Sequence, residues 1–184
     1  MLKGKLWLHQ MFLFGVLGVL ILWSVLNSTF VFNISLLWWL LGAMIGFLFV
    51  FLDRFIYSVV SKPNETLSLR MKELFGQTKF VEGVRLLLIE RFDQKELVMR
   101  SAMFMVVWIV LAFFTTTSVM NFFARGFMLG IGTHLVFDLA YDFVKDKERL
   151  DLWFWHIKRT LEPEEKRIFV VVVGVIYILL AFSL

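Results

Sequence analysis

Long apolar blocks separated by short charged segments dominate the pattern of this chain. Blocks of about twenty residues match the length of a helix that crosses the roughly 30 Å hydrocarbon core of a bilayer. The pattern therefore predicts an all-α, polytopic membrane protein, a single integral membrane domain over residues 1–184 with about five transmembrane helices. The predicted spans are 6–26, 36–60, 101–120, 126–144 and 168–184.

The second block allows two interpretations because it ends in a charged pair. If Trp38 and Trp39 belong to the outer aromatic belt, the span runs to about Ser61 and contains Asp53 and Arg54. If it begins near Phe30, the pair marks its inner end instead. We favour the first interpretation, in which both charges lie inside the span.

Two further segments alternate charges with apolar residues at helical spacing. One covers 64–92 and is interrupted by "FGQT"; the other covers 148–161 and ends before Pro163. Such amphipathic helices lie in the plane of a membrane surface. We predict that both are interfacial helices on the cytoplasmic side.

The amino-acid composition restricts the class of protein to which this chain can belong. Hydrophobic residues make up 60% of the chain and the mean hydropathy is +0.81. The absence of cysteine excludes disulfides and thiolate metal sites. The net charge of +4 comes from basic residues that flank apolar blocks, so lipid headgroups rather than nucleic acid are the expected partners.

The basic residues also predict a topology. With five spans and a cytoplasmic N-terminus, 18 of the 19 lysine and arginine residues lie inside and only Arg125 lies outside. This agrees with the positive-inside rule. We expect a multi-pass protein of the cell membrane, with its C-terminus outside.

The fourth block carries a polar stripe. Gly126, Gly130, His134, Asp138 and Asp142 recur every four residues, so they share one slowly drifting helix face. The glycines favour close helix packing. A charge inside the membrane costs about 3 kcal/mol on insertion scales, so the ionisable half should face a partner or a water-filled cavity.

Candidate partners come from other blocks. Asp53 and Arg54 are expected in the same layer as His134 and Asp138, while Arg100 lies nearer the cytoplasmic surface. Asp53, His134 and Asp138 could bind a divalent metal such as zinc, manganese or iron.

Two alternatives are open for the cluster. Arg54, Arg100 and Asp142 could form ion pairs, which would give the cluster a purely structural role, or they could take part in a proton relay. His9 and His156 are predicted to be interfacial histidines rather than ligands.

Two short stretches resemble a known family. "GIGTHLVFDL" is similar to the G-x-x-x-H-L-x-x-D stretch of the bacterial LexA-binding, inner-membrane-associated, metal-dependent hydrolase family, and "FLDRFIY" to its Asp-rich D-x-D-H segment. The resemblance implies Asp53, His134 and Asp138 as metal ligands, hydrolase activity at the cytoplasmic face and an inner-membrane location. Arg54 follows Asp53 where the family has a further Asp and His, and the family's Thr-His-Ser segment has no counterpart.

Three functions are therefore open. The first is a non-catalytic membrane scaffold whose segments 64–92 and 148–161 bind lipid or a cytoplasmic protein, or whose glycine face forms a homo-oligomer. The second is a metal-dependent hydrolase, and the third a small ion or proton transporter. The few histidines and the lack of an inverted repeat favour the scaffold, with a polar cluster that is structural or ion-binding.

Overall fold

The computed structural model describes residues 2–28, 32–90 and 94–184, with side chains from Trp7 onward. Phe30, residues 91 and 92 of the predicted interfacial segment, and the side chains of Lys3 and Lys5 lie outside this description. No β-strand occurs within the described ranges. The helices are α1 (Leu2–Leu26), α2 (Ile34–Phe49), η1 (Val50–Leu52), α3 (Asp53–Ile56), η2 (Tyr57–Ser61), α4 (Thr66–Gly76), α5 (Phe80–Ile89), α6 (Ala102–Ser118), α7 (Phe122–Lys145), α8 (Lys147–Leu152) and α9 (Pro163–Ala181).

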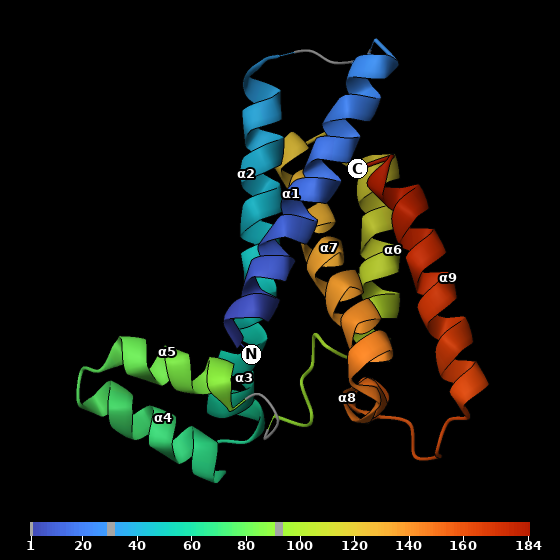
Figure 1. The fold of residues 1–184 in the computed structure, drawn as a ribbon. Coiled ribbons are helices and arrows are strands. Elements are labelled where there is room, and N and C mark those ends of the chain that lie inside the picture. The colour runs from blue at the N-terminus through green and yellow to red at the C-terminus, as the bar shows by residue number, and fades with distance from the viewer. Residues whose placement is uncertain (1, 29–31, 91–93) are drawn as a thin grey trace.

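The long helices form an upright bundle in which successive members run in opposite directions (Figure 1). α1, α6 and α9 run upward in that view, whereas α2 and α7 run downward. The α4–α5 hairpin projects sideways at the lower end, where α8 also lies. The chain thus separates a bundle of apolar helices from a lower, charged end.

Within the described residues, three helical segments are long and apolar enough to cross a membrane: Trp7–Leu26, Ile34–Ser61 and Phe122–Lys145. α6 is apolar but has only 17 residues. α9 begins with Glu164, Glu165, Lys166 and Arg167, so its apolar part is shorter than the helix itself. Many large apolar side chains on the outside of the bundle are exposed, as expected where lipid replaces water.

The run from Ile34 to Ser61 is helical throughout but changes its winding. Asn33 caps its start by accepting hydrogen bonds from the Ser35 and Leu36 amides, at 3.0 and 3.3 Å. The winding tightens in η1 and widens to a π-helix in η2. Asp53 and Arg54 lie between these two irregular turns and are buried.

The segment predicted to be interfacial over 64–92 forms the α4–α5 hairpin. Leu67, Met71 and Leu87 are buried between its helices. Gly83 allows this close packing, because a Cβ there would lie 2.3 Å from the Phe75 ring. The opposite surfaces carry charged residues and the exposed side chains of Phe80 and Val81.

The second predicted interfacial helix is shorter than expected. α8 ends at Leu152, whereas the pattern predicts a helix over 148–161. Trp153 and Phe154 turn into the core, and the Ala102 amide donates to the Trp153 carbonyl at 2.7 Å. This tertiary hydrogen bond and the burial of two aromatic rings outweigh the helical periodicity.

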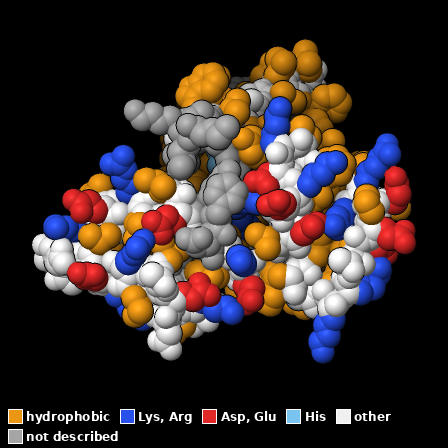
Figure 2. Space-filling model, turned by 60° about the horizontal axis from the view of Figure 1, so that its bottom comes forward, with side chains coloured by type: hydrophobic (Ala, Val, Ile, Leu, Met, Phe, Trp, Pro, Cys, Tyr) orange, Lys and Arg blue, Asp and Glu red, His pale blue; other side chains and the backbone are white. Residues whose placement is uncertain are grey.

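Charged side chains gather at the lower end of the molecule, where Figure 2 shows lysines and arginines intermixed with acids over the hairpin and the segments around α8. Arg125 is the exception, since it follows the start of α7 at the opposite end. Its guanidinium donates to the Val119 and Thr116 carbonyls at 3.0 and 3.3 Å. Arg125 therefore satisfies carbonyls at the end of α6.

Candidate functional site

A glycine seam joins α2 to α7. A Cβ at Gly126 would lie 2.0 Å from the Trp39 carbonyl oxygen, and one at Gly130 would lie 2.0 Å from that of Ala43. Gly42 and Gly46 on α2 approach the α7 backbone equally closely. The two helices therefore pack backbone against backbone, which only glycine permits here.

The seam leads to a buried polar cluster centred on Asp138. One carboxylate oxygen lies 2.5 Å from Arg100 Nη2 and 3.4 Å from His134 Nε2, and the other lies 3.1 Å from His9 Nε2. His134 and Asp138 are fully buried, and His9 and Arg100 are at most 6% exposed. The cluster joins α1, the start of α6 and α7.

The hydrogen bonds of His134 fix its tautomer. Nδ1 lies 2.7 Å from the Phe47 carbonyl oxygen, which can only accept, so Nδ1 carries the hydrogen. Nε2 of the neutral ring then accepts from Arg100 Nη2, at 3.2 Å. The Phe47 carbonyl thus orients the ring and turns the Nε2 lone pair toward Asp138 and Arg100. In metal sites, a hydrogen bond to the other ring nitrogen orients a ligand histidine in the same way.

His9 differs from the prediction that it is an interfacial histidine. It is 3% exposed, and its ring centroid lies 4.4 Å from that of His134 and 4.3 Å from that of Phe137. Phe47 and Phe51 complete an aromatic surround. α1 therefore contributes a side chain to the cluster, and the contact between His9 and Asp138 connects α1 to α7. His156 is half-buried and rests against Trp155.

Asp53 does not join His134 and Asp138. Its carboxylate accepts hydrogen bonds from three successive amides, those of Val98, Met99 and Arg100, at 3.2, 2.9 and 3.3 Å. A carboxylate that accepts several backbone hydrogen bonds is well satisfied as an anion. Asp53 thus fixes the entry to α6, and the structure assigns its oxygens to the backbone rather than to an ion.

Arg100 connects the two acidic positions. Its amide donates to Asp53, while its guanidinium reaches Asp138 and His134. Arg54 extends the network toward the hairpin by donating to the Leu87 carbonyl and to Gln94 Oε1, at 3.0 and 3.2 Å. Asp53 and Asp138 are thus linked through Arg100, by its backbone amide and its guanidinium.

Asp142 lies one turn below Asp138. It accepts a hydrogen bond from Trp153 Nε1 at 3.2 Å, and it lines a small cavity together with Arg100 and Arg149. The Trp153 indole thereby anchors the segment after α8 to α7. Asp142 belongs to the charged end of the stripe rather than to the histidine pair.

The buried charges balance. Among the described residues, the buried ionic side chains are Asp53, Asp138 and Asp142 with Arg54, Arg100 and Arg149. These six side chains, three acidic and three basic, have no net charge between them.

His9, His134 and Asp138 nevertheless offer ligand atoms within 4.8 Å of one another. A metal ion bound there would have to displace the Arg100 guanidinium from His134 Nε2 and from the Asp138 oxygen that it now contacts.

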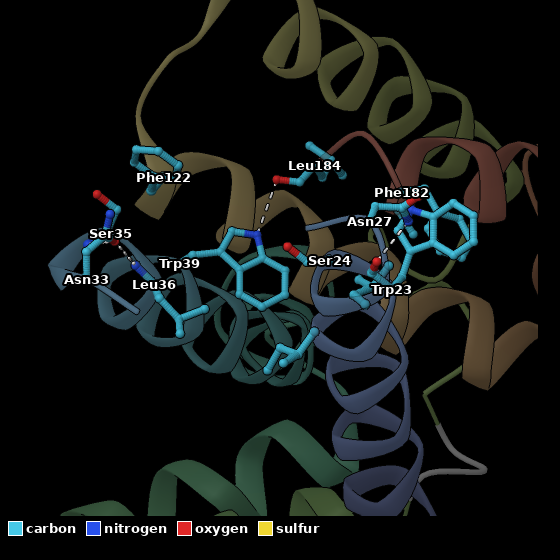
Figure 3. A pocket seen from close by; sticks show the side chains of 13 residues that line it. Trp23, Ser24, Asn27, Asn33, Ser35, Leu36, Trp39, Phe122, Phe182 and Leu184 are labelled. Carbon is cyan, nitrogen blue, oxygen red and sulfur yellow. Dashed lines mark hydrogen bonds between the residues drawn. The ribbon is translucent and has the colours of Figure 1, made fainter. Parts of the chain in front are cut away.

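Several cavities open on the bundle, and two of them bear on the site. A groove of about 330 Å³ lies between α1 and α2, with His9 at one end. A larger cavity of about 580 Å³ lies at the opposite end of the molecule, beside the Trp23 and Trp39 indoles (Figure 3). Trp39 donates to the Leu184 carbonyl at 3.2 Å, and Asn27 donates to that of Trp23 at 2.8 Å. The larger cavity is lined by no ionisable side chain, whereas His9 lines the smaller one.

Comparison of the chain with models of known protein families, with curated proteins and with solved structures gives no match.

Sequence reasoning missed several residues of the site. Gly42 and Gly46 carry the same four-residue spacing as Gly126 and Gly130, so the signal for both sides of the seam is present. Nothing local to His9 indicates that it meets Asp138, because their contact depends on how α1 crosses α7. Gln94 lies in a charged loop and gives no signal of burial.

Proposed function

We propose that this chain is a multi-pass membrane scaffold, in which a charge-balanced polar cluster locks the helices and the α4–α5 hairpin forms a platform on the cytoplasmic surface. The balance of three buried aspartates against three buried arginines carries the proposal. The oxygens of Asp138 contact Arg100 and His9, and those of Asp53 accept hydrogen bonds from backbone amides. Groups engaged in this way hold helices in register.

The arrangement of helices supports a five-span topology for this scaffold. Helices with apolar, exposed outer faces run alternately up and down, and the charged residues gather at one end (Figures 1 and 2). That end contains the hairpin and the segment around α8, so it is the cytoplasmic end by the positive-inside rule. α6 and the apolar part of α9 supply the two spans beyond the three longest segments.

The hairpin supports the platform role. It follows the end of η2 directly and is held to the bundle by the hydrogen bonds of Arg54 with Leu87 and Gln94. α5 lies above α4 in Figure 1, nearer the bundle, and Val81 on it is 82% exposed. We expect α5 to face the bilayer and α4, with Arg70 and Lys72, to face water.

Metal content and stability test the structural role of the cluster. The wild type and His134→Ala would be purified in detergent, exchanged into metal-free buffer and analysed for zinc, manganese and iron. The scaffold predicts no stoichiometric metal in either protein and a lower melting temperature for the variant. Near-stoichiometric metal that disappears in His134→Ala would contradict it.

Introduced cysteines test the topology and the platform, because the chain has no cysteine of its own. A spin label at Val81 should be more accessible to oxygen than to an aqueous nickel chelate, and a label at Lys72 should show the reverse. Labelling of a cysteine at Lys95 from outside the cell would overturn the proposed topology.

The second candidate is a metal-dependent enzyme of the hydrolase type that the sequence resembles. One observation favours it: His9, His134 and Asp138 could supply two imidazoles and a carboxylate, a donor set found in catalytic zinc sites. Arg100 would then have to swing away for the metal to bind. The metal analysis above separates this function from the scaffold.

A further inference from the structure

The groove between α1 and α2 brings the buried cluster to the outside of the bundle. Its floor consists of buried Leu13 and Phe47 beside His9, and its rim consists of the exposed Phe14, Met44 and Leu48. Its volume of about 330 Å³ falls within the range of small-molecule sites, about 300–1,000 Å³. His9 and Gln10 are its polar residues at one end, and the rest of its lining is apolar.

The hydrogen bonding of His9 defines what that polar end can recognise. Nε2 lies 3.1 Å from a carboxylate oxygen of Asp138, outside hydrogen-bonding geometry. The negative charge so close to Nε2 favours the neutral tautomer that carries its hydrogen there. Nδ1, on the other edge of the ring, then presents a lone pair and hydrogen-bonds no residue that the structure describes. The nitrogen available at the groove is therefore an acceptor, and it fits a hydrogen-bond donor such as a hydroxyl group.

Charge selects among such donors. The cluster behind His9 is already neutral, with Arg100 matched to Asp138. A charged headgroup at His9 would add an uncompensated charge to a dry site, which is costly. A neutral hydroxyl adds a hydrogen bond without changing the balance.

The apolar length of the groove selects the other half of the ligand. Leu13, Phe14, Met44 and Leu48 extend from His9 along two helices that are long and apolar enough to cross a membrane. If the chain is embedded as proposed above, on which this inference rests, the groove opens into the inner leaflet. Hydrocarbon chains are the solvent there, and a chain in the groove would cover exposed rim residues.

We propose that this groove binds a long-chain amphiphile of the inner leaflet, with its hydrocarbon chain between α1 and α2 and an uncharged hydroxyl donating to His9 Nδ1. Asp138 holds the ring in the accepting tautomer. The buried cluster thereby serves a binding site that faces lipid rather than the aqueous phase.

The test uses the full chain in nanodiscs of saturated phosphatidylcholine and a hexadecanol that carries a photoreactive diazirine. Labelled peptides are mapped by mass spectrometry. Saturable labelling is expected at the groove residues of α1 and α2. Unlabelled hexadecanol should compete about five-fold better than hexadecane, the gain typical of one hydrogen bond, and better than palmitate.

Two variants and a control complete the design. Met44→Trp should fill the groove and remove its saturable labelling, whereas Val110→Trp, on the exposed face of α6, should leave it unchanged. His9→Phe keeps an aromatic ring but should abolish the preference for hexadecanol over hexadecane. Equal competition by hexadecane, labelling that does not saturate, or labelling insensitive to Met44→Trp would each overturn the proposal.

The same experiment distinguishes a failure of this proposal from a failure of the membrane insertion on which it rests. The lipophilic probe should also label the exposed outer faces of α6 and α9 without saturation. If those faces react but the groove does not saturate, only the amphiphile site is wrong. If the outer faces do not react either, the proposed insertion is wrong.

Discussion

α1 and α7, with 25 and 24 residues, are the longest single α-helices that the structure describes, but their surroundings differ. In the most apolar stretch of α7, 56% of residues are buried inside the protein, compared with 17% in α1. α7 touches α2, α6, α8, α9 and α1, and it carries the glycines, a histidine and the aspartates. Among the described side chains of α1, Leu, Val and Phe are exposed and His9 provides a polar contact with α7.

The difference shows what determines composition in this bundle. A helix surrounded by other helices needs small residues for close approach and polar residues that find partners. A helix with a mostly exposed circumference needs apolar bulk, and its position depends on a few contacts. Changes in α7 should therefore affect the whole fold, whereas changes in α1 should act locally.

The largest effect is expected from Asp138→Leu on α7. It leaves the buried Arg100 guanidinium without its carboxylate, which costs about 3–5 kcal/mol of unfolding free energy. Unfolding in mixed micelles with increasing SDS measures the loss. Adding Arg100→Met should restore much of the stability, since the unpaired charge is then gone. Asp151→Ala, which removes an exposed partner of Lys166, serves as the control and should cost at most about 1 kcal/mol.

The next effect is expected from Gly130→Ala. Its Cβ would overlap the Ala43 carbonyl oxygen at 2.0 Å, so the α2–α7 seam must open, at a cost of about 1–3 kcal/mol. The matched control is Gly18→Ala on α1, where no heavy atom lies within 4 Å of the added carbon. The same SDS titration should show Gly18→Ala as neutral or slightly stabilising. Equal losses for both variants would contradict the contrast between the helices.

A smaller and local effect is expected from His9→Phe. The variant loses the polar contact with Asp138, typically worth about 1.5–3 kcal/mol for a charged partner, but the larger ring recovers part of this by packing against Phe47 and Phe137. The measurement is maleimide labelling of a cysteine at Leu17 on α1, compared with one at Leu135 on α7, both buried in the wild type. Labelling should accelerate only at position 17. Acceleration at both positions would mean that α1 and α7 open together.

The smallest effect lies outside the bundle, at the start of α9. Arg159 donates to both oxygens of Glu165 at 2.8 and 2.5 Å, and this pairing, helped by the Glu162 amide, lowers the pKa of Glu165 to about 2. Because the folded pKa is depressed, the stabilisation is complete above the ordinary value of 4.5 and is lost as the pH falls toward 2. Carbon-13 NMR of the Glu165 carboxyl should show this titration. Arg159→Gln should return its pKa toward 4.5 and barely change the melting temperature.

The order of the helices was largely predictable, because apolar blocks and helical periodicity are local properties. Three of the five predicted blocks lie within long helical runs, and the blocks 101–120 and 168–184 extend at most three residues beyond α6 and α9. The break at "FGQT" falls at the turn between α4 and α5. The end of α8 was not predictable, since it depends on where Trp153 and Phe154 find space in the core. Five spans and insertion itself remain predictions.

The candidate site was half predictable for the same reason. The four-residue spacing that puts His134 beside Asp138 is contained in one helix, so the sequence reveals it. Asp53 was assigned to the same site from its depth and from the family resemblance. Neither fixes its rotation about the helix axis, and its carboxylate faces the residues before α6. His9 was underestimated because its partner comes from a distant segment.

The hydrogen bonds of Asp53 also constrain the order in which native contacts can form while the chain is synthesised. The amides that donate to its carboxylate lie 45 to 47 residues later in the chain. His9 likewise contacts Asp138, which belongs to α7 and is synthesised much later. During synthesis, the first two apolar segments therefore leave the ribosome with polar side chains that have no native partner yet. Their native packing must therefore wait until the second half of the chain has been synthesised.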